Sequence, residues 1–315
     1  MFLAGCALRS SISMPAVSCT YARMDKSARL LCLALLLLLP SASITQQPSD
    51  RLGPGPSPLL KAVVANQEQS EKELDQYERI QREEGRSMSG PVDGKIWRVF
   101  PTGTGAYKIP LSPDGKPLSP EGYRHDLEKL EKYLVWVTQT GSAQQEAYAK
   151  AQRKRKERFD LLEAMYQAFI FTRDGEELRA GRTLLRFTIK PNPSYKPTTR
   201  NTIIFKRVQG TVWIDEQSSQ MAKIEGTVTE DISLALFVAK VYKGSHFMQE
   251  RYEVAPGVWQ PSFEQYDFDG RKFFSSVSIH ERTFYSDYKR VGPPQEAVQV
   301  VRAELNKLRA KDAAR

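Results

Sequence analysis

Hydrophobic and polar residues alternate along much of the second half of the chain, as is typical of β-strands with one buried face and one solvated face. The alternation is clearest in residues 210–215 and 220–228, on either side of Ser218. We therefore predict a β-hairpin with one apolar side and one polar side. In its second strand, simple alternation places Ala222 on the same face as Ile224.

The same pattern extends to both sides of this hairpin and predicts one antiparallel meander over residues 182–290. Residues 185–190 alternate strictly, and residues 202–208 are rich in β-branched and aromatic side chains, so both segments are expected to be strands. Asp269-Gly270 is a dipeptide suited to a two-residue turn, where both central positions need positive φ. A sheet of this kind needs helices, a ligand, or both to cover its apolar face.

The first half of the chain predicts mainly helices, with a short run of strands between them. Apolar residues at helical spacing, together with Pro120-Glu121 as a helix start, indicate helices near residues 59–76, 120–134 and 143–169, and a last one at 296–308. Turn residues separate three shorter segments that we expect to be strands, at 77–83, 95–100 and 106–111. The fold class is thus α+β, an antiparallel sheet covered by helices.

The N-terminal residues have the composition of a secretory signal peptide. Leu30 to Leu39 is almost entirely leucine, with Lys26 and Arg29 before it and small residues after Pro40. This apolar run is too short for a bilayer core of about 30 Å. We expect residues 1–43 to be a cleaved leader, translation to start in fact at Met24, and residues 44–58 to be a flexible linker.

Cysteine placement limits the chemistry of the exported protein. The three cysteines, Cys6, Cys19 and Cys32, all lie in the predicted leader. The mature chain would then contain no disulfide, no thiolate metal site and no cysteine nucleophile. A location in the periplasm or cell envelope follows from the same leader.

The charge is moderately basic. The formal net charge is +9, of which the leader carries three, leaving six on the predicted mature chain. Export argues against a nucleic-acid partner, whereas anionic lipid head groups remain a candidate. A basic run in the predicted long helix is either a solvated face or a docking patch for a membrane surface or an acidic partner: Arg153, Lys154, Arg155 and Lys156.

Catalytic motifs are not recognisable. Of the three histidines, His125 and His246 lack a partner at metal-ligand spacing, and His280 adjoins Glu281 on a predicted strand, where neighbours point to opposite faces. Gly103-Thr-Gly105 has no helix behind it to complete a phosphate-binding loop. We expect neither a catalytic site nor a metal or cofactor. A hydrolase with two catalytic carboxylates is the enzymatic alternative, for which the sequence nominates no pair.

Several segments resemble the outer-membrane lipoprotein-sorting superfamily. The resemblance rests on residues 169–182, which read Phe-Ile-Phe-Thr-Arg-Asp-Gly-Glu-Glu-Leu-Arg-Ala-Gly-Arg, and on residues 210–215, 258–261 and 285–288. It implies an open (half) antiparallel β-barrel covered by helices, here over residues 59–291, followed by a C-terminal helix at 292–315. That superfamily contains a lipoprotein carrier, its outer-membrane receptor and a regulatory relative.

Such a sheet can enclose an apolar space large enough for hydrocarbon chains. The expected function is therefore non-enzymatic binding of lipid or lipoprotein acyl chains in the envelope. The alternative is an interaction or stress-sensing module on the same scaffold with a filled interior. The candidate residues for an apolar cavity are Phe187, Ile189, Phe205, Trp213, Ile224 and Phe273.

Overall fold

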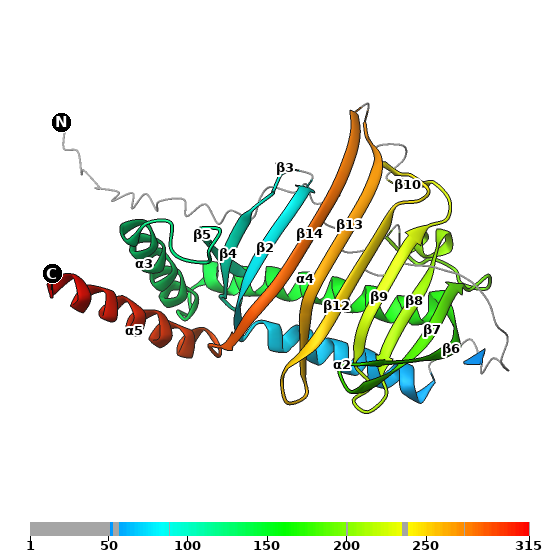
Figure 1. The fold of residues 1–315 in the computed structure, drawn as a ribbon, viewed down its shortest axis with the longest axis horizontal. Coiled ribbons are helices and arrows are strands. Elements are labelled where there is room, and N and C mark those ends of the chain that lie inside the picture. Colours follow the sequence, from blue (N-terminus) through cyan, green and yellow to red (C-terminus); the bar gives the residue numbers. More distant parts are fainter. Residues whose placement is uncertain are drawn as a thin grey trace, which may run out of the picture.

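A computed structural model describes residues 51–52, 57–87, 89–199, 201–234, 239–273 and 275–314. The predicted leader and most of the predicted linker lie outside the described residues, as do Phe274 and the middle of the apolar run 232–242. The elements, labelled as in Figure 1, are β1 (Arg51–Leu52), α2 (Pro58–Leu74), β2 (Tyr77–Ser87), β3 (Gly90–Pro91), β4 (Lys95–Pro101), β5 (Ala106–Leu111), α3 (Pro120–Val137), α4 (Ser142–Ala168), β6 (Phe169–Arg179), β7 (Arg182–Pro191), the 3₁₀ helix η1 (Asn201–Arg207), β8 (Val208–Asp215), β9 (Met221–Val228), β10 (Ile232–Leu234), β11 (Ala239–Val241), β12 (His246–Ala255), β13 (Val258–Lys272), β14 (Ser275–Arg290) and α5 (Pro294–Ala313).

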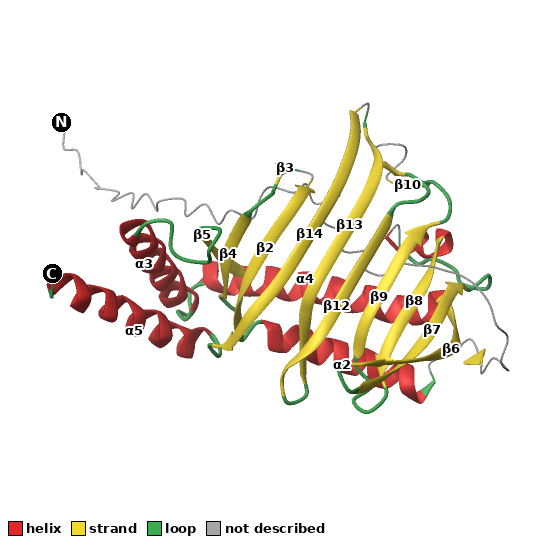
Figure 2. Ribbon diagram, in the orientation of Figure 1, coloured by secondary structure: helices red, strands yellow, loops and turns green. Residues whose placement is uncertain are grey.

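The strands form a single large antiparallel sheet (Figures 1 and 2). Within the described residues it contains 14 strands, in the order β1-β6-β7-β8-β9-β12-β13-β14-β2-β4-β5, with β3, β10 and β11 added at its margins. Strands β1 and β5 end this order, so the sheet is open. The predicted α+β class, with an antiparallel sheet and covering helices, is confirmed.

Helices α2 and α4 cross the inner face of the sheet (Figure 1). Strands β7 and β8 turn alternate apolar residues toward them, and Phe187, Val212 and Ile214 join one continuous buried cluster with Met165 of α4 and Leu60 of α2. Alternation thus places the core where the sequence predicted it.

Helices α3 and α5 cover the other face, at the β4–β5 end. Val99 of β4 pairs with Arg79 of β2, and the side chains of this pair lie on the inner face. Arg98 and Phe100 stand on either side of Val99 in the strand, so their side chains point to the outer face. Phe100 packs in a second buried cluster with Leu130 of α3 and Leu305 of α5. The C-terminal helix is therefore an integral part of the sheet's outer layer.

Local sequence explains the start of α3. Pro120 occupies the first turn, where its missing N–H costs nothing, and the Ser119 side chain accepts a hydrogen bond from the Gly122 N–H. Leu127, Leu130 and Leu134 follow at helical spacing and are fully buried, as predicted.

The expected strand at 202–208 is wrong for residues 202–207, which belong to η1, while Val208 begins β8. Ile204 and Phe205 are adjacent in sequence and both buried in the main core, whereas a strand would turn them to opposite faces. The Phe205 ring meets Phe169 edge-on, with the ring centroids 5.5 Å apart. Tertiary packing overrides strand propensity here.

The expected turn at Asp269-Gly270 is also wrong. Strand β13 continues through it to Lys272, which pairs with Ser275 of β14, so the connection begins after Lys272. Gly270 instead allows close approach of β11, because a Cβ there would collide with the Lys240 carbonyl oxygen.

Two further differences concern strand pairing. A register shift in the β8–β9 ladder leaves Ala222 without a paired residue, between the Trp213–Lys223 and Ile214–Met221 pairs. This shift breaks the simple alternation, so the side chains of Ala222 and Ile224 do not share a face. Arg51–Leu52, inside the predicted linker, pairs with the otherwise open edge of β6.

Truncation within η1 tests this placement. Phe205→Ala is expected to lower the free energy of unfolding by about 3–5 kcal/mol, since it empties a fully buried site. Ile203→Ala, in the same turn but 44 % exposed, should change it by no more than about 0.5 kcal/mol. Urea unfolding measures both; similar losses for the two variants would refute the assignment.

Candidate functional site

The structure brings four of the six predicted cavity residues together. Phe187, Ile189, Phe205 and Ile224 all belong to the main core beneath α2 and α4, and none is more than 3 % exposed. They contact other buried side chains, including Met165 and Phe247, in the same cluster. The space between the helices and this half of the sheet is thus occupied by protein side chains.

The other two predicted residues lie elsewhere. Trp213 points to the opposite face of β8, where it is buried in a small separate cluster with Leu184, Ala222 and Trp259. Phe273 sits in the connection between β13 and β14 and is 57 % exposed. The six residues therefore do not line one common space.

The remaining half of the inner face is polar. Lys108 Nζ lies 2.7 Å from Glu83 Oε1, and the Tyr285 hydroxyl donates to Glu264 Oε2 at 2.8 Å. Burial, together with the charges of Glu83 and Glu264, raises the pKa of Glu281. Glu83 is buried and Glu264 and Glu281 are half-buried, and carboxylates in such positions do not suit a hydrocarbon chain.

Polar contacts also hold the C-terminal half of α2 against the sheet. The buried guanidinium of Arg251 donates to Gln67 at 2.9 Å, and Gln260 Nε2 donates to the Ser70 carbonyl at 2.9 Å. These bonds are formed within the protein interior, where losing a partner is costly.

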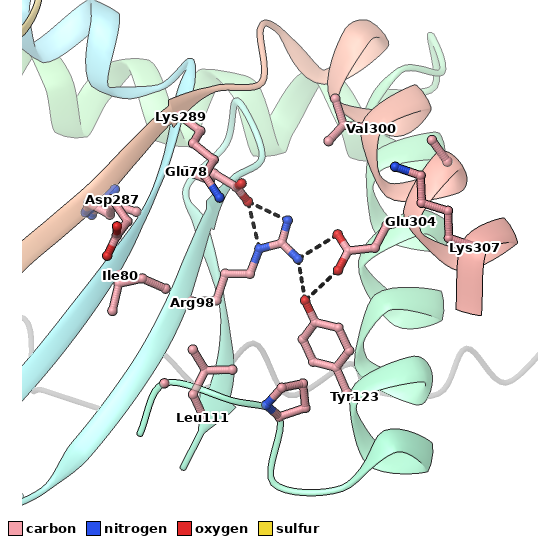
Figure 3. A pocket seen from close by; sticks show the side chains of 14 residues that line it. Glu78, Ile80, Arg98, Leu111, Tyr123, Asp287, Lys289, Val300, Glu304 and Lys307 are labelled. Carbon is pink, nitrogen blue, oxygen red and sulfur yellow. Dashed lines mark hydrogen bonds and ion pairs between the residues drawn. The ribbon is translucent and has the colours of Figure 1, made fainter. Parts of the chain in front are cut away.

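A groove lies on the outer side of the sheet, between α5, α3 and strands β2, β4 and β14 (Figure 3). Its volume is about 600 Å³, within the range of small-ligand sites. Ile80, Leu111, Pro117 and Val300 contribute apolar walls.

Arg98 forms the floor of the groove and is fully engaged. Its Nε donates to Glu78 Oε2 at 2.7 Å, while its Nη1 donates to Glu304 Oε2 at 2.8 Å and to the Tyr123 hydroxyl at 2.6 Å. The Tyr123 hydroxyl donates in turn to Glu304 Oε1 at 2.6 Å. Figure 3 shows the three partners converging on the guanidinium from β2, α3 and α5.

Burial and charge shift both titrating groups on this floor. Burial alone would lower the pKa of Arg98, but the charges of Glu78 and Glu304 outweigh it and raise the pKa. Burial raises the pKa of Tyr123 to about 12, against the opposing charge of Arg98. The floor is therefore a preformed network in which both carboxylates already have a cation.

The rim carries most of the groove's unbalanced charge. Lys289 and Lys307 are exposed and have no ion partner among the described residues, while the exposed carboxylate of Asp287 accepts a hydrogen bond from Ser286. Asp287 has φ +53 beside a register shift in β14, which turns this stretch toward the groove. The groove can accept a partner with mixed polar and apolar character.

The predicted basic run is only partly a surface patch. Arg153, Lys154 and Lys156 are exposed, and Lys156 pairs with Asp160 at 2.7 Å. Arg155 instead turns inward, with hydrogen bonds to Asp75 and to the Gly103 carbonyl at 3.0 Å. Arg155 therefore links α4 to neighbouring segments of the fold and does not belong to the exposed basic surface.

His280 has a partner that sequence did not reveal. Its Nδ1 lies 3.0 Å from Asp267 Oδ1 on the paired strand, and its Nε2 lies 2.9 Å from Ser278 Oγ. The Ser278 hydroxyl also reaches Asp269 Oδ1 at 2.7 Å, so its single proton has a competing carboxylate acceptor. That competition, on an exposed strand surface, fits a bridge between β13 and β14 better than an activated nucleophile.

No group of three or more His, Cys, Asp or Glu in the described part of the chain is placed to hold a metal ion. None of the described helices is both long and apolar enough to cross a membrane. The chain matches no family model, no curated protein and no solved structure.

The groove was not predicted from sequence because its parts are distant along the chain. Glu304 and Arg98 are 206 positions apart, and nothing in the local pattern links them. One weak signal was available: Arg98 stands between Ile96 and Phe100, where alternation predicts a buried side chain that needs a counter-charge.

Alkaline titration tests the floor of the groove. The pKa of Tyr123 is higher in the folded protein than its usual value near 10, so its contribution to stability is complete below pH 10 and is lost as the pH rises through about 12. The free energy of unfolding should therefore fall less between pH 10 and 12 in Tyr123→Phe than in the parent. Urea unfolding at a series of pH values measures this difference. Equal pH dependence in both proteins would contradict the network.

Proposed function

We propose that this protein is a non-enzymatic interaction module of the cell envelope with a filled interior. The observation that carries the proposal is the occupied space beneath α2 and α4, where four of the expected cavity residues pack against other side chains. An acyl chain would have to displace this core, at a cost set by every contact it breaks.

The polar half of the inner face supports the same reading. Glu83, Glu264 and Glu281 lie where a carrier would need apolar walls, and lipid chains gain stability only from apolar contact. The open sheet with covering helices is compatible with the half-barrel of the lipoprotein-sorting superfamily, so the proposal keeps that scaffold and its envelope location. It replaces cargo binding with recognition at the surface.

The groove over Arg98 is the place we assign to a partner segment. Its floor is preformed, which reduces the ordering cost of binding, and its walls combine apolar side chains with the exposed cations of the rim. A short segment with both apolar and polar side chains fits such a site.

Lipid content tests the proposal directly. Protein purified under mild extraction should carry no stoichiometric acylated material by mass spectrometry, and should not enhance the fluorescence of a long-chain fatty-acid probe. The physical reason is the filled core. Phe205→Ala opens space for about one aromatic ring in that core, so it should bind benzene, whereas the parent and Ile203→Ala should not.

Stoichiometric lipid in the parent protein, or enhanced fluorescence of the fatty-acid probe with the parent, would restore the carrier interpretation. Either outcome would mean that the helices separate from the sheet in solution to admit a hydrocarbon chain.

A further inference from the structure

The hairpin of β13 and β14 ends in an exposed aromatic residue. The two strands extend beyond the ends of β2 and β12 in Figure 1, and their last described pair is Lys272 with Ser275. Phe273 follows Lys272 and is 57 % exposed. More than half of this side chain is exposed, so its burial within its own chain contributes little to the fold.

The backbone at this position makes the residue more unusual. Phe273 has φ +54, a left-handed conformation that Gly or Asn adopts at far lower cost than a bulky residue. Turns of this kind ordinarily carry those residues. A costly side chain in a strained position points to a use outside the fold.

Positive charge surrounds the base of this tip. Arg271 is exposed and has no ion partner among the described residues, and Lys240, on the neighbouring β11, pairs with Arg271 in the ladder. Lys240 also forms an ion pair with Asp231 at 2.8 Å. The described β13–β14 residue pairs from Gly270 to Lys272 contain no carboxylate. The next residue of β13 away from the tip, Asp269, is the first that carries one.

A second aromatic residue completes the surface. Tyr242 is 36 % exposed, and Lys240 Nζ lies 5.6 Å from the centroid of its ring. Tyr242 donates its backbone N–H to the Asp269 carbonyl, which fixes it beside β13. Aromatic side chains next to cations are the composition favoured at a bilayer interface.

We propose that this tip, consisting of Phe273, Tyr242, Arg271, Lys272 and Lys240, docks on an anionic lipid surface, with Phe273 entering the interfacial layer. A protruding tip is too small for a stable protein interface, which needs about 1,000 Å² or more of buried area. Insertion of one aromatic ring together with the attraction of nearby cations for anionic lipid gives, in contrast, a weak and reversible membrane association. The docking is independent of the groove and of the filled interior.

Vesicle sedimentation with the full chain tests the proposal, and every variant carries the same N-terminus so that differences report on the tip. The parent should bind vesicles of phosphatidylcholine mixed with phosphatidylglycerol, and bind pure phosphatidylcholine more weakly. Phe273→Gly should lower partitioning about fivefold or more. Arg271→Gln should lower it about fivefold at low salt and less at high salt.

The strain at Phe273 gives a second readout that a purely structural role would not produce. Phe273→Gly relieves the left-handed backbone, so its melting temperature should equal or exceed that of the parent while its vesicle binding falls. Phe273→Leu retains an apolar side chain and should keep most of the binding.

Two matched controls separate the tip from other surfaces. Leu178→Ser removes an aliphatic side chain that is 78 % exposed on β6, and should leave binding unchanged. Arg153→Gln removes a cation from the exposed face of α4 and should have a smaller effect than Arg271→Gln.

The proposal is overturned if the parent does not distinguish anionic from neutral vesicles, or if folded Phe273→Gly binds as tightly as the parent. A larger loss in Arg153→Gln than in Arg271→Gln would assign the membrane contact to α4 instead. A parent that ignores vesicles but captures an acidic protein through Phe273 would exclude the lipid partner.

Discussion

Coverage of the sheet's inner face is the constraint on which the rest of the structure depends. An antiparallel sheet with one apolar face must bury it, and here α4 and the N-terminal half of α2 supply the covering side chains. Tyr166 stacks on Phe171 and Phe205 meets Phe169, so the helix, the 3₁₀ turn and the edge strands share one core. Once this contact is made, the inner side has no need of a ligand to satisfy its apolar surface.

The outer layer follows from a different interaction. Phe100 and Ile109 face outward because alternation on β4 and β5 leaves no other choice, and α3 with α5 covers them. Arg98 lies on the same face and would be a costly buried charge without its two carboxylates. The groove exists because the helices must leave room for this polar network at the edge of an apolar contact.

The sequence predicted helices and strands accurately where apolar residues follow a single helical or strand periodicity through the whole segment. The helix containing Leu127, Leu130 and Leu134 and the strand at residues 106–111 were predicted nearly to their ends, since both rely on local pattern alone. The inner location of Phe187 and Ile189 followed from the same alternation. That alternation also placed Trp213 opposite Val212 and Ile214, so its assignment to the interior conflicted with the pattern itself.

The remaining errors have nonlocal causes. Residues 202–208 have strand composition, but packing of Ile204 and Phe205 into one core selects a 3₁₀ helix. Gly270 resembles a turn residue, yet it serves the approach of a strand that is 30 positions earlier in the chain at Lys240. An apolar sheet face borders a cavity or a filled core according to how closely the helices pack against it. The pattern of hydrophobic residues along the sequence does not specify that packing.

The pairing of β2 with β14 also governs the order in which the molecule can fold. These strands lie side by side within the sheet, although they come from opposite ends of the described chain. The ladders from β6 to β9 join neighbours in sequence and can form early, whereas the sheet cannot become continuous until the last strand has been synthesised. The nascent polypeptide consequently remains without its completed sheet until β14 has been made, so two separate blocks of strands must coexist before they join.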